Sequence, residues 1–105
     1  MRIKVLSSAI DDLDAGRKFY DRQGEGLGAY FLDSLFSDID SLALYAGIHG
    51  KVFGYHRLLS KRFPYAVYYL LEEADLAVVW RVLDLCQHPA RIRRALGCRR
   101  RIGAP

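Results

Sequence analysis

The sequence lacks any apolar run long enough to cross a membrane. A spanning helix needs about 18 to 20 such residues, whereas the hydrophobic residues, 51% of the 105, are interrupted throughout by charged ones. The Met1–Lys4 start leads directly into mixed sequence, unlike the apolar stretch of a signal peptide. We therefore expect a cytoplasmic protein, and its length suits one folded domain.

Cysteine is scarce, and no set of metal ligands is visible. Cys86 and Cys98 stand twelve positions apart, a spacing that matches no zinc knuckle and no redox CxxC pair. His49 and His56 have no cysteine or carboxylate at ligand spacing beside them. We expect two reduced thiols, no metal and no other cofactor.

Acidic residues are absent from positions 90–105, which contain six arginines. Positions 8–45 have the opposite bias, with eight acidic and three basic residues. Such asymmetry is typical of a protein whose basic face meets nucleic acid or an acidic partner. For Arg99, Arg100 and Arg101, a solvated basic tail is the alternative.

Two helices are predicted in the first half of the chain. Ser7 and Ser8 are candidate N-caps of the first, and Gly-Glu-Gly at 24–26 ends it. The second is predicted over 27–45, because apolar residues recur at helical spacing from Phe31 onward. Two helices joined by a glycine-containing loop form an antiparallel hairpin, whose inner apolar stripe needs a further surface to cover it.

Strands are predicted to supply that surface. A short one is expected at 2–6, and three more at 52–59, 65–71 and 76–85. The last is nearly unbroken apolar sequence, which is typical of a buried central strand. Trp80 within it is predicted to be core. Asp84 in the same strand is expected to pair with Arg57 or Arg81, or to lie where the strand meets the surface.

The chain ends in a short basic helix. Pro89, after His88, can serve as its first residue, and Gly97 is expected to stop it. The predicted order is β-α-α-β-β-β plus this helix, an α+β fold. We assign 1–97 to one domain and 98–105 to a basic C-terminal tail.

Two stretches of the chain resemble a known family. SSAIDDLDAGRKFYDRQGEGLGAYFLDSL, at 7–35, resembles the helical hairpin of ParE/RelE toxins. HRLLSKRFPYAVYYLLEEADLAVVWRVLDLCQHPARIRRAL, at 56–96, resembles that superfamily's arginine-bearing strand, Arg-Phe-Pro-Tyr block, Tyr-rich and Val-rich strands and basic exit helix. The likeness runs from 3 to 96.

The resemblance implies both a fold and a function. The fold is a twisted antiparallel sheet with two helices on one face and an open, basic second face. The function is that of the toxin in a bacterial type II toxin-antitoxin (plasmid stabilisation) pair, a growth inhibitor neutralised by a cognate acidic antitoxin. Dimerisation is left open, because an antitoxin can dimerise the complex while the toxin remains a protomer.

The superfamily contains two modes of action. ParE-like members inhibit DNA gyrase by binding, and RelE-like members cut mRNA on the ribosome. On the nuclease pattern, Tyr65 and Cys86 occupy the places of two arginines, and neither can hold a fixed positive charge over a phosphate. We therefore favour a ParE-like binding toxin. A RelE-like endoribonuclease with an atypical site and a remnant without toxicity are the alternatives.

Candidate residues follow from these hypotheses. A metal-independent nuclease site would be built from Arg57, Lys61, Arg62, Tyr65 and His88, since histidine exchanges protons near neutral pH. The candidates for binding the target or the antitoxin are Arg57, Arg62, Arg91, Arg93 and Arg94. Each has a structural alternative: surface arginine for Arg57, solvated turn charge for Lys61 and Arg62, packing for Tyr65, a turn hydrogen bond for His88 and a favourable helix-end charge for the last three arginines.

Overall fold

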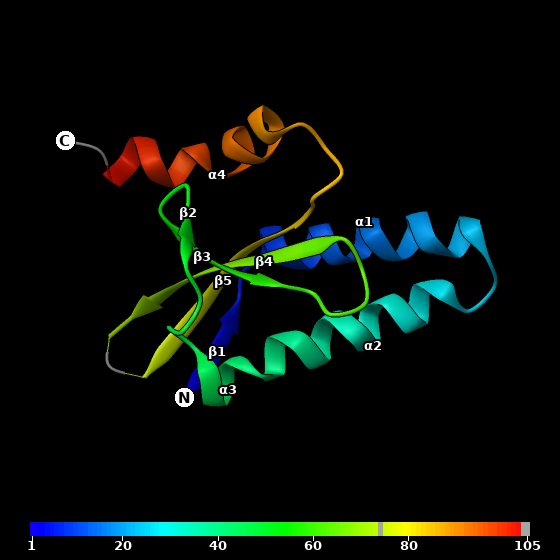
Figure 1. The fold of residues 1–105 in the computed structure, drawn as a ribbon, viewed down its shortest axis with the longest axis horizontal. Helices are drawn as coiled ribbons and strands as arrows, with labels where there is room; N and C mark the ends of the chain where they lie inside the picture. The colour runs from blue at the N-terminus through cyan, green and yellow to red at the C-terminus, as the bar shows by residue number, and fades with distance from the viewer. Residues whose placement is uncertain (74, 104–105) are drawn as a thin grey trace.

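The fold is an α+β arrangement of one sheet with helices on both of its faces (Figure 1). The computed structural model describes residues 1–73 and 75–103, with side chains up to Leu96. The elements are β1 (Arg2–Val5), α1 (Ser7–Gln23), α2 (Leu27–Asp40), α3 (Leu42–Tyr45), β2 (Lys51–Val52), β3 (Tyr55–Leu59), β4 (Tyr65–Glu72), β5 (Leu76–Asp84) and α4 (Pro89–Gly103). None of the helices described is long and apolar enough to span a membrane.

The strands lie in the order β1-β5-β4-β3-β2. As predicted, β3, β4 and β5 are consecutive antiparallel strands. β1 instead pairs in parallel with β5, so the expectation of a wholly antiparallel sheet is wrong at this edge. The reason is that the α1–α2 hairpin runs away from the sheet and back again. The Met1 amine donates to the Ala43 carbonyl at 3.4 Å, so after the hairpin the chain has returned to the end of the sheet where β1 begins.

Two helix boundaries differ from the prediction. α1 begins directly after Leu6 with no side-chain cap, and the Ser8 hydroxyl instead donates to the Trp80 carbonyl at 2.7 Å. The predicted 27–45 helix is divided at Ser41 into α2 and α3. The Ser8 hydrogen bond joins residues 72 positions apart, a contact that local helical periodicity does not contain.

The predicted 52–59 strand is a hairpin, and the C-terminal helix is longer than expected. Phe53 and Gly54 have φ of 55° and 86°, which makes a tight turn between β2 and β3. α4 continues past Gly97 to Gly103, so most of the predicted tail is helical. The side chains of 97–103, which include Cys98 and the last three arginines, and residues 104–105 lie outside the described part.

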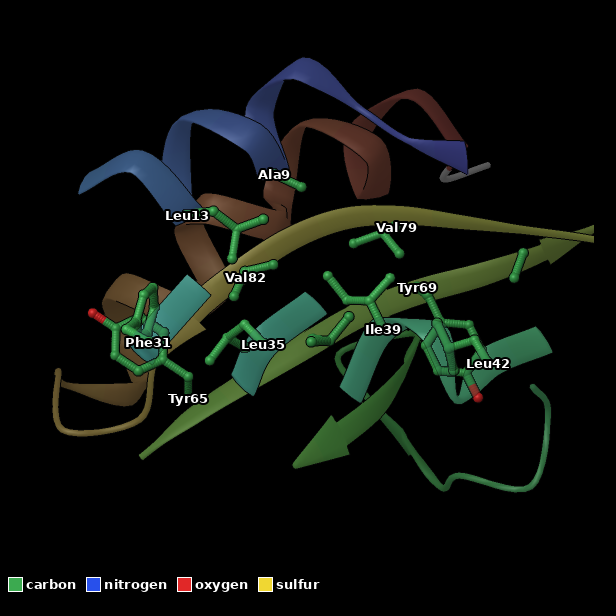
Figure 2. Packing of buried hydrophobic residues seen from close by; sticks show 12 residues of the cluster. Ala9, Leu13, Phe31, Leu35, Ile39, Leu42, Tyr65, Tyr69, Val79 and Val82 are labelled. Atoms are coloured by element: carbon green, nitrogen blue, oxygen red, sulfur yellow. The ribbon is translucent and has the colours of Figure 1, made fainter. Parts of the chain in front are cut away.

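Apolar side chains fill both faces of the sheet. The helical-side core lies between the sheet and the α1–α2 hairpin (Figure 2), and its buried members are Ala9, Leu13, Phe31, Leu35, Ile39, Leu42, Tyr65, Val67, Tyr69, Ala77, Val79 and Val82. The α4-side core consists of Tyr55, Ala66, Tyr68, Leu70, Leu83, Ile92 and Leu96. The second face is therefore not open where α4 packs, because the apolar strand β4 needs cover on both sides.

Candidate functional site

Arg57 lies on β3 opposite Tyr68 of β4. Tyr68 belongs to the α4-side core and has no exposed surface. Burial raises the pKa of Tyr68, and a hydrogen bond with Arg57 opposes that shift. Arg57 is half-buried, and its positive charge is held at this face of the sheet. Its partner Tyr68 is fully buried and cannot contact a substrate in this arrangement.

Tyr65 points to the opposite face of the sheet. It packs against Phe31 in the helical-side core, with ring centroids 4.8 Å apart, and is 7% exposed. Burial, with a smaller contribution from Asp84, raises the pKa of Tyr65 to about 12. Tyr65 therefore has the packing role expected as its structural alternative, and it does not share a surface with Arg57.

Lys61 and Arg62 lie in the turn between β3 and β4, where both are exposed. The turn is held against α2, because the Lys61 amide donates to the Asp38 carboxylate at 3.4 Å. Asp38 itself is buried, at 6% exposure. The two cations thus occupy a defined place beside the helical hairpin.

His88 is exposed at the start of α4 and acts as its cap. Its Nδ1 accepts a hydrogen bond from the Ala90 amide at 3.0 Å, and its carbonyl accepts one from Arg91 at 2.8 Å. This is the turn hydrogen bonding expected as the structural alternative for His88. The five nuclease candidates are consequently spread over two sheet faces, a turn and a helix start.

The arginines at the start of α4 face away from the core. Arg91, Arg93 and Arg94 are exposed, while Ile92 and Leu96 of the same helix are buried against the sheet. The helix is also held by hydrogen bonds to its carbonyls: the Arg81 guanidinium donates to Ala95 at 3.2 Å and the Tyr55 hydroxyl to Leu96 at 3.3 Å. A basic, outward-facing surface therefore sits on a well-anchored helix.

The anchor of this region is an ion pair between α1 and β5. Arg81 donates to Asp12 through Nε at 2.7 Å and Nη2 at 2.8 Å, and the Val82 amide donates to the same carboxylate at 3.0 Å. β1 pairs with β5 only as far as Val79, so the β5 edge beyond it needs another acceptor. The sequence does not reveal this role of Asp12, since nothing local links positions 12 and 81.

Two further expectations for β5 have a mixed outcome. Asp84 pairs with neither arginine; it lies at the strand end, where its carboxylate accepts a hydrogen bond from the Cys86 amide at 2.8 Å. The surface alternative for Asp84 is thus the correct one. Trp80 packs against the α4-side core but is only half-buried, and it falls at an irregularity in the β4–β5 register.

A histidine-tyrosine cluster was also missed from the sequence. The buried Tyr69 hydroxyl accepts from the Gly47 amide at 2.8 Å and contacts His49 Nδ1. His56 stacks on the Tyr69 ring, with centroids 5.1 Å apart, and its Nδ1 bonds the His49 carbonyl at 2.7 Å. Burial lowers the pKa of His49, and the nearby His56 lowers it further. The cluster fastens the 46–50 loop to the sheet.

Known proteins share this arrangement of elements. The chain matches no protein-family model and no curated protein. Among solved structures, it is similar to a chain of the chromosomal ParDE toxin-antitoxin system from P. aeruginosa, with a TM-score of 0.72 and 20% sequence identity, over 81% of this chain and 96% of that chain. The chain has a ParE-like fold. At this identity the likeness extends to the fold alone, and it confirms the α+β architecture predicted from the sequence.

Within this ParE-like fold, the exposed arginines of α4 and the cations of the β3–β4 turn lie on different elements.

Proposed function

We propose that the chain is the toxin of a bacterial type II toxin-antitoxin pair and that it acts, like ParE toxins, by binding its target. The ParE-like fold supports the toxin assignment, since the solved ParDE chain is matched over 96% of its length. DNA gyrase is the proposed target. The proposed antitoxin is an acidic protein with a segment that folds on binding and lies across the toxin.

The separation of the candidate catalytic side chains is the observation that favours a binding toxin over a nuclease. The candidate Tyr65 is 7% exposed, and Tyr68, the hydrogen-bond partner of the candidate Arg57, is 0% exposed. The two tyrosines belong to the cores on opposite faces of the sheet. A general acid or base must come within hydrogen-bond reach of the proton that it transfers, and neither hydroxyl can do so from these positions. The exposed cations, in contrast, are available for contact.

The proposed contact residues are those that the fold leaves accessible. They are Arg57, Arg62, Arg91, Arg93 and Arg94, which are exposed or half-buried. Arginine pairs with carboxylates and phosphates in a bidentate geometry. These residues therefore suit either an acidic antitoxin or an acidic face of the target.

A RelE-like nuclease is the second candidate, and one contact favours it. Arg57 and Tyr68 are hydrogen-bonded neighbours of the kind that could place a cation and a proton donor together. That pair would need α4 to leave the sheet before RNA could reach it.

Induction of the gene alone in a bacterial host tests the proposal. We expect growth arrest with loss of negative supercoiling in a reporter plasmid, and no codon-phased ends in primer extension of cellular mRNA. The triple variant Arg91→Gln, Arg93→Gln, Arg94→Gln should relieve the arrest, while Lys18→Gln, an exposed change on α1, should not. Codon-phased cuts with normal supercoiling would favour the nuclease, and growth unaffected by induction would favour a remnant without toxicity.

A further inference from the structure

The helical hairpin projects beyond the sheet (Figure 1). Aromatic rings from α1, α2 and the β3–β4 turn pack against one another in a row. The ring of Phe63, in the β3–β4 turn, is 4.8 Å from Tyr20 of α1 and 5.5 Å from Tyr30 of α2. Phe19 extends the row, 5.1 Å from Tyr20. Phe19 and Tyr30 remain 44% and 48% exposed. Exposed aromatic rings at the ends of such a row are typical of a binding surface, because aromatic residues are enriched at interfaces.

Two cations border this row. Lys61 and Arg62 immediately precede Phe63 and are exposed, and neither forms an ion pair with another residue whose side chain is described. Their turn is fixed to α2 through the Asp38 carboxylate. The positive charges are thus held next to the rings and still lack an anionic partner within the described part of the chain.

We propose that this surface, formed by Tyr20, Tyr30, Phe63, Lys61 and Arg62, binds an acidic peptide segment that places an apolar side chain against the rings. Carboxylates of the segment would meet the two cations, and the Arg62 guanidinium can hold one of them in a bidentate pair. Tyrosine, tryptophan and arginine are enriched among the few residues that carry most of the binding energy in protein interfaces. Assignment of the segment to the antitoxin rests on the proposed function, whereas the binding chemistry does not.

The charge of the hairpin favours a peptide over single-stranded nucleic acid, the other ligand that combines ring stacking with cations. Positions 8–45 contain eight acidic and three basic residues, and Arg17 of α1 is already paired with Asp14 and Asp21. A nucleotide chain needs a track of several phosphate contacts. Here it would meet two cations and then an acidic surface, whereas a short peptide can place its one or two carboxylates at the two cations and its apolar side chain on the rings.

Titration of the isotopically labelled protein with the peptide acetyl-Leu-Glu-Trp-Glu amide, followed by amide chemical shifts, tests this proposal. We expect the shifts to centre on positions 19–20, 30 and 61–63, with weak affinity, on the order of millimolar. The double variant Lys61→Gln, Arg62→Gln should weaken binding about five- to tenfold, because two exposed ion pairs are lost. The matched double variant Lys4→Gln, Lys51→Gln changes the net charge equally at exposed sites on β1 and β2 and should bind as the wild type does.

Two further measurements separate the contributions of charge and rings. Tyr30→Ala should weaken binding with both cations in place, and the Gln analogue of the peptide should bind as weakly to the wild type as the acidic peptide binds to the Lys61 and Arg62 variant. All substituted side chains are exposed, and the same spectra show that each variant is folded.

Several results would overturn the proposal. They are shifts centred on α4, no shifts at the aromatic row, equal losses in the two double variants, and stronger binding of a short oligothymidine than of the peptide. If the protein binds the peptide at this row but its induction does not arrest growth, the proposed toxin function is rejected and the proposed binding surface is retained.

Discussion

Replacing Asp12 with alanine should destabilise the fold far more than an ordinary surface change. The substitution removes two hydrogen bonds from Arg81 and one from the Val82 amide, all between 2.7 and 3.0 Å. The two side chains are only 14% and 28% exposed. Loss of one partner of a buried ion pair costs about 3–5 kcal/mol; because water can still reach part of Arg81, we expect a loss of about 2–4 kcal/mol in the free energy of unfolding.

Urea unfolding at neutral pH measures this loss, and a double-mutant cycle with Arg81→Met isolates the pair. The coupling energy should exceed about 1 kcal/mol, since both groups share one set of bonds. Asp14→Ala is the matched control, because it removes another carboxylate from the same helix. Asp14 forms solvent-accessible ion pairs with Arg17 and Lys18, and such pairs contribute little to stability. If Asp12→Ala matched Asp14→Ala in stability, or if the cycle showed no coupling, the argument for this anchor would fail.

Three other outcomes are expected. Gly16→Ala would place a Cβ 2.5 Å from the buried Phe31 ring, so urea unfolding should show a loss of about 1–3 kcal/mol; Gly50→Ala, with nothing within 4 Å of its Cβ, is the control, and equal effects would contradict the packing argument. Burial holds the pKa of His49 below its ordinary 6.5, so the unfolded chain takes up the proton more readily: stability should be complete above that value and fall as the pH drops below it, less so in His49→Gln, and an unchanged urea midpoint would refute this. Tyr65 keeps its proton up to a pKa of about 12, against 10 in the unfolded chain, so stability should be lost as the pH rises through this range; ultraviolet difference absorbance against Tyr65→Phe follows the ionisation, and a phenol that titrates near 10 in the folded protein would contradict its burial.

Local sequence signals were sufficient for the main elements of the fold. The apolar periodicity from Phe31 and the Gly-Glu-Gly break predict the helical hairpin, and α1 and α2 lie on the two sides of that break. The same signals misplaced helix ends and merged β2 with β3, because the turn at Phe53 and Gly54 depends on backbone conformations that a β-prone composition does not reveal.

The candidate site was predictable only in part. The exposure of Lys61, Arg62 and the α4 arginines agrees with their charge and turn or helix-end positions. The separation of Arg57 from Tyr65 could not be seen, because it depends on which face of β4 each side chain occupies and on what covers that face. The aromatic row was also missed, because its members come from three separate segments, α1, α2 and the β3–β4 turn, which only the tertiary structure brings together.

By itself, the sequence determined the main helices and strands, their order and the charge asymmetry, because helical and strand periodicity, turn residues and charge are local properties. Only the tertiary structure decided that β1 lies parallel to β5, that α4 covers the second face of the sheet, and that Asp12 closes the free edge of β5. These outcomes depend on contacts between segments far apart in the chain, such as Asp12 and Arg81, which pair backbone groups and cover apolar surface. A local sequence pattern does not indicate which distant segment will make such a contact.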